Sequence, residues 1–267
     1  MLLLRTTFIQ QYIVIQTRAK HFAQPMGSVL HALCRKHCID LHQPQIPEGL
    51  NFGYFEFMGL GTVIDSLAAI KKLVFEDKKL TMDQLIDALE ANFEGYEDIQ
   101  KLCFGAPKHG NDIEDVDQLP RRFFRDVERI YRSHGPDYFG YEAHMDPFSL
   151  SYHNYFAPMT GALPNGRQKG VALTDASVSA MPGTDVNGST ALIKSAAQAI
   201  DTVRNNCNHM NMKFLPSALE GPSGTRMLLN LIKTYFDLGG GHIQFNCVSS
   251  ETLCDAQEHP QNYKNLV

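Results

Sequence analysis

The sequence lacks long apolar runs, an excess of basic residues and a dense set of cysteines. No stretch approaches the ~20 apolar residues that a membrane-spanning helix needs, although short apolar runs occur at residues 2–4 and 12–15. The 24 Lys and Arg residues are outnumbered by 29 Asp and Glu residues, for a net charge of -5, so no basic field is available to attract a nucleic acid. The six cysteines are not densely spaced, which indicates reduced thiols. We therefore expect a cytoplasmic protein that binds neither membranes nor nucleic acids.

The composition is that of a globular protein. Of the 267 residues, 43% are hydrophobic and 20% are charged, so the chain can bury a sizeable core in one large domain or two smaller ones. We find no internal repeat, low-complexity tract or charged linker. One continuous domain is the simpler interpretation.

Two amphipathic helices are expected in the first half of the chain. Residues 80–93 open with Thr81 and Gln84 in capping-box spacing, and apolar side chains then recur on one helical face up to Phe93. Residues 63–74 carry a similar apolar stripe. These two segments give the firmest helical patterns in the sequence.

The last third has the pattern of a βαβ unit. Residues 209–214 alternate between polar and apolar, residues 225–238 form an amphipathic helical pattern, and residues 242–248 alternate again. Gly239, Gly240 and Gly241 can end the helix in left-handed conformations. The crossover rule then predicts two parallel neighbouring strands joined by a right-handed connection.

The second of these strands has one strongly polar face. His242, Gln244 and Asn246 point to one side, whereas Ile243 and its alternate neighbours point to the other. The polar face is either a solvated face of an edge strand or the polar lining of a barrel. The pattern alone does not choose between them.

Five blocks of the sequence resemble glycyl radical enzymes, in the order in which that family carries them. The blocks are T-V-I-D-S-L-A-A-I-K-K at 62–72, G-A-L-P-N-G-R at 161–167, T-D-V-N-G-S-T-A-L at 184–192, N-H-M-N-M-K-F-L-P-S-A-L at 208–219, and G-H-I-Q-F-N through D-A-Q-E-H-P at 241–260. The resemblance is to the pyruvate formate-lyase-like family, and it covers residues 21–267. Residues 1–20 are poorly matched.

The resemblance implies an α/β fold, namely part of a ten-stranded glycyl radical enzyme barrel, mostly its second half-barrel with surrounding helices. In the family, a block like that ending at Val267 leads into R-V-x-G-Y, whose glycine bears the radical, and a C-x-E loop with the thiyl cysteine lies upstream. None of the six cysteines here has that setting. We therefore expect a C-terminal fragment with no catalytic residue of its own and no turnover alone.

The resemblance also implies cofactors and partners. The family uses a glycyl radical installed by an activating enzyme that carries S-adenosylmethionine and an iron-sulfur cluster. The complete protein should be an anaerobic homodimer that cleaves C–C or C–heteroatom bonds of a small molecule, like formate acetyltransferase, glycerol dehydratase or arylacetate decarboxylase. The chain itself should bind no cofactor. The alternative is a non-catalytic, truncated paralogue that binds the activating enzyme or a full-length subunit.

An aromatic strand at residues 51–61 is one candidate wall of the substrate cavity. Phe55, Phe57 and Leu60 are the apolar candidates, with ordinary core packing as the alternative. Glu56 lies between two phenylalanines, where a carboxylate must be paired, protonated or directed at substrate. The aromatic content of this strand favours an aryl substrate over a small polyol.

Residues 149–156 are a second candidate wall and are expected to form another barrel strand. Leu150 and Tyr152 would share the face that touches substrate in relatives, and His153 could donate a hydrogen bond. Satisfied structural hydroxyls and imidazoles are the alternative. Arg167, in the turn that follows, is expected to fix its loop and not to bind substrate.

A possible metal site was also considered near the N-terminus. His31, Cys34 and Cys38 share a helical face, with His37 beside them. Zinc sites of that ligand class usually bring two pairs together from separate turns. We therefore expect an ordinary helix and no metal.

Overall fold

The computed structural model describes residues 10, 13–14, 17, 21–40, 52–133, 142–205 and 208–263, with the backbone alone at 52–55 and 142–143. The chain divides into two compact units, Met1–Phe55 with Arg122–Asp146, and Glu56–Arg121 with Pro147–Val267. Three elements pass from one unit into the other: strands β1 (Phe52–Phe57) and β2 (Glu142–Pro147), which form a two-stranded sheet, and helix α7 (Glu114–Arg132). The fold is mixed α/β, as expected.

The first unit carries two short helices, α2 (Pro25–Leu30) and α3 (Ala32–His37). A carboxylate oxygen of Asp40 accepts bonds from Gln24 N and Ser28 Oγ, each at 2.9 Å. Cys38 follows α3 in a left-handed conformation, with φ of 53°. The predicted helical face of His31, Cys34 and Cys38 is therefore divided between separate elements. No group of three metal-ligating side chains is arranged to hold an ion in the described part of the chain.

The helical part of the second unit contains both helices predicted from the sequence. α4 (Leu60–Ile70) continues into the π-helix η1 (Lys71–Glu76), and α5 (Met82–Glu90) and α6 (Glu97–Gly105) follow. The capping box is confirmed, because Thr81 Oγ accepts from Gln84 N at 3.2 Å and Thr81 N donates to Gln84 Oε1 at 2.9 Å. The four elements enclose one apolar core: Ala69, Leu73, Leu80, Leu85, Ala88, Phe93, Cys103 and Ala106.

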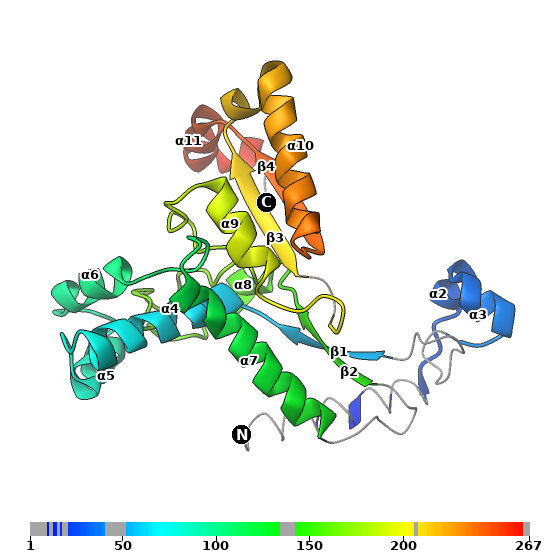
Figure 1. The fold of residues 1–267 in the computed structure, drawn as a ribbon, viewed down its shortest axis with the longest axis horizontal. Helices are drawn as coiled ribbons and strands as arrows, with labels where there is room; N and C mark the ends of the chain where they lie inside the picture. Colours follow the sequence, from blue (N-terminus) through cyan, green and yellow to red (C-terminus); the bar gives the residue numbers. More distant parts are fainter. Residues whose placement is uncertain are drawn as a thin grey trace. The chain divides into compact units, whose positions relative to one another are not determined.

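The predicted βαβ unit is confirmed. Strands β3 (His209–Phe214) and β4 (His242–Cys247) are parallel and joined by the short helix η2 (Pro216–Leu219) and helix α10 (Gly221–Asp237). Figure 1 shows α10 lying along the two strands. The helix begins earlier than predicted because Pro222 suits the first turn of a helix. Gly239, with φ of 94°, occupies the left-handed region after the helix.

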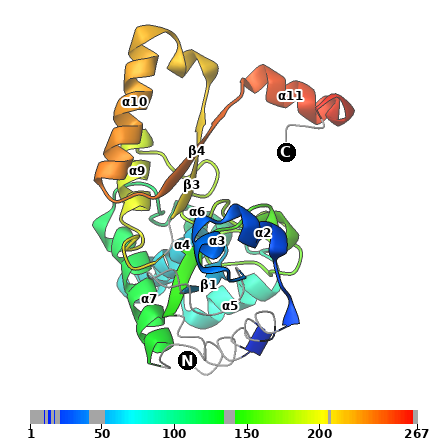
Figure 2. The ribbon, with the colours of Figure 1, turned by 90° about the vertical axis from the view of Figure 1, so that its right-hand side faces the viewer.

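The prediction of a strand at 149–156 is wrong. Strand β2 ends at Pro147, and the short helix α8 (Tyr152–Tyr155) follows a turn in which Tyr152 N donates to Ser149 O at 2.7 Å. Leu150 has a φ of 41°, outside the extended region. Local backbone bonds therefore replace strand pairing here. The remaining helices of the second unit are α9 (Ser189–Ala197), α11 (Ser250–Glu258) and η3 (Pro260–Asn262) (Figure 2).

Candidate functional site

The shared face of β3 and β4 is polar along its whole length. The parallel register pairs His209 with His242, Asn211 with Gln244, and Lys213 with Asn246. Because alternate residues of a strand point to the same side, these six side chains form three polar rows. On the opposite face, Met210 is fully buried. The polar pattern predicted for one strand therefore extends over both.

A buried loop at residues 174–181 runs beside β3 and adds further polar groups. Val178 N donates to His209 O at 3.4 Å, and Asn211 N donates to Ser179 Oγ at 2.9 Å. Asp175 Oδ2 accepts from Asn211 Nδ2 at 3.2 Å and lies 3.6 Å from Lys213 Nζ. The loop therefore neutralises Lys213 and fixes Asn211.

The same loop contains two consecutive strained residues. Ala176 and Ser177 have φ angles of 47° and 75°, a left-handed conformation that side chains other than glycine rarely adopt. Ser177 Oγ donates to Phe57 O at 2.6 Å, and Gly61 N donates to Ser177 O at 3.0 Å. The strained turn thus ties the end of β1 and the start of α4 to the polar face.

Three rings lie in tilted contact at the first row of the polar face. The ring of Phe148 lies 4.3 Å from that of His209, which lies 4.7 Å from that of His242. Burial, and then the charge of His242, lower the pKa of His209 to about 4. His209 is therefore neutral near pH 7, and an uncharged imidazole there can donate or accept a hydrogen bond.

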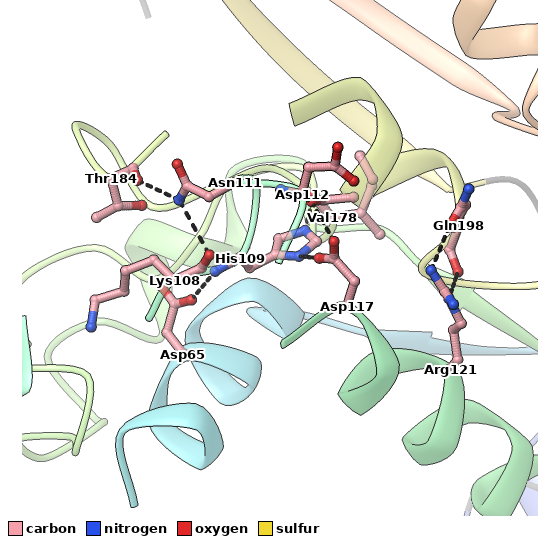
Figure 3. Close-up of polar contacts among 12 residues, drawn as sticks. Asp65, Lys108, His109, Asn111, Asp112, Asp117, Arg121, Val178, Thr184 and Gln198 are labelled. Carbon is pink, nitrogen blue, oxygen red and sulfur yellow. Dashed lines mark hydrogen bonds and ion pairs between the residues drawn. The ribbon is translucent and has the colours of Figure 1, made fainter. Parts of the chain in front are cut away.

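A second polar cluster, with a buried centre, lies between α4, α7 and α9 (Figure 3). His109 is fully buried: its N donates to Asp65 Oδ1 at 2.7 Å, its Nε2 lies 2.9 Å from Val178 O, and its Nδ1 lies 3.7 Å from Asp117 Oδ1. Ser195 Oγ donates to Asp117 Oδ2 at 2.9 Å. Although this is a serine, histidine and aspartate together, the serine faces the carboxylate and not the imidazole, so no nucleophile is activated. The cluster joins three segments of the unit.

Asp65 is the most perturbed carboxyl of this cluster. It has no exposed surface, its Oδ2 has no hydrogen-bond partner, and burial raises its pKa to about 6 against the lowering effects of the His109 N–H and the Lys108 charge. Burial likewise lowers the pKa of Lys108, whose Nζ donates to Cys103 O at 2.6 Å. Neither residue was predicted, because a single Asp in an amphipathic helix carries no local signal.

The predicted substrate-binding residues of the first segment differ in exposure. Leu60 is 3% exposed at the start of α4, and Phe57 is half-buried beside the strained loop. The side chain of Glu56 is exposed in this chain. The side chain of Phe55 lies outside the described residues.

The second pair of predicted residues lies at the surface. Leu150 is 64% exposed and Tyr152 is 45% exposed. The ring of Tyr152 lies 6.3 Å from that of Tyr155, which neighbours it on α8. His153 Nδ1 lies 3.4 Å from Ser149 Oγ. These residues form an aromatic surface instead of a strand face.

Arg167 fixes its loop, as predicted. Its guanidinium donates to the carbonyls of Val171, Thr160, Gly161 and Ala157 at 2.6 to 3.2 Å, and the residue is 2% exposed. Every nitrogen of the guanidinium is used for these bonds. Four of its five N–H donors are therefore committed to the loop.

Comparisons with known proteins place the chain in a family. Residues 2–157 match the Pyruvate formate lyase-like family and residues 174–267 match the Glycine radical family. The chain belongs to the pyruvate formate lyase-like glycyl radical enzymes. Its 267 residues are 59% identical over the whole chain to isethionate sulfite-lyase of Bilophila wadsworthia and 36% identical, over 90% of the chain, to trans-4-hydroxy-L-proline dehydratase of Clostridioides difficile.

A solved structure agrees with the family assignment. Hydroxyproline dehydratase from Clostridioides difficile, with trans-4-hydroxy-L-proline bound, superposes with a TM-score of 0.81 at 34% identity over 96% of this chain. The chain spans about a third of the length of these relatives, 32% in each case. In the described part of the chain, no helix combines the length and apolar character required to cross a membrane.

Proposed function

We propose that the protein carrying this chain is a glycyl radical lyase that cleaves the C–S bond of a small hydroxyalkanesulfonate. The observation that carries the proposal is the 59% identity to a sulfite-lyase over the whole chain, against 36% to a dehydratase of the same family. Isethionate is 2-hydroxyethanesulfonate, and loss of hydrogensulfite from it leaves acetaldehyde. The reaction is redox-neutral and requires no co-reactant.

The chain would contribute part of a barrel wall to that enzyme. The polar face of β3 and β4, with Phe57 at its edge, fits a lining that must be both shaped and polar for a hydroxylated anion. The aromatic surface at Leu150 and Tyr152 would close the cavity, together with Phe55, Glu56 and Leu60. Excluding water around a carbon radical is the chemical purpose of such an enclosure.

The hydrogen-abstracting groups would come from outside these 267 residues. A glycyl radical installed by an activating enzyme with S-adenosylmethionine and an iron-sulfur cluster would supply the radical chemistry. A thiyl cysteine would act on substrate in a homodimeric protein. The residues of this chain would orient the substrate and exclude water.

The test uses the gene region that includes this chain and its flanking sequence. The full-length product, activated anaerobically, should show a glycyl radical doublet in electron paramagnetic resonance and release sulfite from isethionate. Turnover of 4-hydroxyphenylacetate or trans-4-hydroxy-L-proline with no turnover of isethionate would overturn the substrate assignment. The 267-residue chain alone should give neither radical nor sulfite, and turnover by it would refute our placement of the catalytic groups.

The alternative function is a non-catalytic paralogue. Flanking DNA that encodes neither an R-V-x-G-Y block downstream nor a C-x-E loop upstream would favour it. The chain should then bind the activating enzyme or a full-length subunit in a pull-down with purified proteins. Both blocks in frame on either side of the chain would support the lyase.

A further inference from the structure

Within the described part of this chain, the main contacts of helix α11 are local hydrogen bonds. Neither α11 nor the adjoining helix η3 contains a buried residue. Among the described helices and strands, η3 is the element that packs substantially against α11. Figures 1 and 2 both show α11 beyond the end of β4 and apart from α10. The direction of the chain after α11 therefore depends on its hydrogen bonds.

One carboxylate joins the end of α11 to the turn that follows it. Asp255 Oδ1 lies 3.0 Å from His259 Nδ1, and Asp255 Oδ2 accepts a bond from Tyr263 Oη. Asp255 and His259 are four residues apart at the end of the helix, the spacing of neighbours on one helical face, and Tyr263 reaches the same carboxylate from the turn beyond it. The same turn is closed by Asn262 N donating to His259 O at 3.0 Å and Tyr263 N donating to Pro260 O at 3.2 Å.

We propose that Asp255 is a positioning residue that sets the direction in which the chain leaves α11 at Tyr263. The phenol bond is charge-assisted and therefore stronger than a bond between neutral groups. In agreement, the hydrogen bond to Asp255 raises the pKa of Tyr263. Loss of one ordinary hydrogen bond changes the population of a conformation about fivefold.

The competing interpretation is an ion pair without consequence. Asp255 and His259 are each about half exposed, at 49% and 50% of their side chains, and exposed pairs commonly stabilise a fold very little. Two features argue against that interpretation here. Asp255 bonds two partners at once, and no buried side chain of α11 competes to fix the turn.

The consequence for catalysis rests on the proposed function. If the radical-bearing segment follows Tyr263, then Asp255 orients the start of that segment relative to the barrel. A change at Asp255 would then lower the yield of radical without touching the substrate cavity. The residue acts through Tyr263 and His259 and contacts no reacting atom.

The test compares the full-length protein with variants D255A, D255N and Y263F, and with the matched control E258Q, which removes a neighbouring exposed charge of α11. Amide hydrogen exchange at Asn262 and Tyr263 should be about fivefold faster in Y263F and faster still in D255A. D255N should be intermediate, because an amide oxygen still accepts from Tyr263. Exchange in β3 and β4 should be unchanged, and E258Q should match the wild-type protein throughout.

Two outcomes overturn the inference. If D255A exchanges at the wild-type rate, Asp255 does not fix the turn. If D255A exchanges faster but forms the glycyl radical in wild-type yield, Asp255 does not position the radical segment. If the wild-type protein forms no radical, the proposed function is wrong. The amide hydrogen exchange of the variants still tests whether Asp255 fixes the turn.

Discussion

The hydroxyl of Tyr235 donates to the side-chain carbonyl of Asn208 at 3.0 Å, joining α10 to the residue that precedes β3. Asn208 Oδ1 also accepts from Gly241 N at 2.7 Å, and Asn208 Nδ2 donates to Ala196 O at 2.8 Å. Both Tyr235 and Asn208 are fully buried. A methyl group added at Gly240 would meet the Tyr235 ring at 2.4 Å, so the glycine is needed for this close approach.

Replacing Tyr235 by phenylalanine should reduce the free energy of unfolding by about 1–2 kcal/mol, because buried acceptors lose their donor. Chemical denaturation measures the change. Tyr155, which is 64% exposed, provides the matched control, and Tyr155→Phe should change stability by less than about 0.5 kcal/mol. Equal effects of the two substitutions would contradict the structural role of the Tyr235 hydroxyl.

Replacing Asp65 by asparagine should alter the dependence of stability on pH. The folded pKa of about 6 lies above the ordinary value of 3.8 for this carboxyl group, so the folded protein holds the proton more tightly than the unfolded chain does. This difference in proton affinity stabilises the folded state by about 3 kcal/mol at most. The stabilisation is complete below pH 3.8 and is lost as the pH rises through 6. The difference between wild-type and Asp65→Asn denaturation curves across pH 4–7 should show this slope. Exposed Asp87, changed to asparagine, should leave the curve unchanged.

Replacing His242 by glutamine should raise the pKa of His209, measured by nuclear magnetic resonance of its ring. The pKa of His209 should recover by less than half of the amount by which it is lowered, because burial is the larger cause of the lowering to about 4. Since the folded pKa lies below the ordinary value of 6.5, the contribution to stability is complete above pH 6.5 and is lost as the pH falls through 4. An unchanged His209 pKa would show that the two rings do not interact electrostatically. Exposed His21, changed to glutamine, is the control.

Replacing Arg167 by lysine should destabilise the protein by about 3 kcal/mol, since four buried or partly buried carbonyls lose their donors and an ammonium group lacks the planar geometry to replace them. Thermal and chemical denaturation measure the effect. Arg226→Lys on the exposed side of α10 provides the matched control. A loss no larger than in the control would mean that the loop from Ala157 to Val171 holds without the guanidinium.

The sequence predicted elements whose cause is local. Thr81 and Gln84 cap α5 by bonds within four residues, and the βαβ unit follows from a change of period and a glycine after the helix. The segment 149–156 was predicted wrongly for a related reason. Its mixed polar and aromatic pattern fits a strand as well as a short helix. In the structure the strand ends at Pro147, and Leu150 adopts a left-handed conformation that forms a turn.

By itself, then, the sequence determined the family, the parallel strands and the polar alternation, because each rests on residues close together in the chain. Only the tertiary structure decided which polar groups are buried. Asp65 and His109, 44 residues apart, share a hydrogen bond, and Ser177 reaches Phe57 O across 120 residues. Such pairs produce no periodic pattern in the sequence, because their energy depends on burial and on a partner far away in the chain. Their positions become known only when the chain is folded.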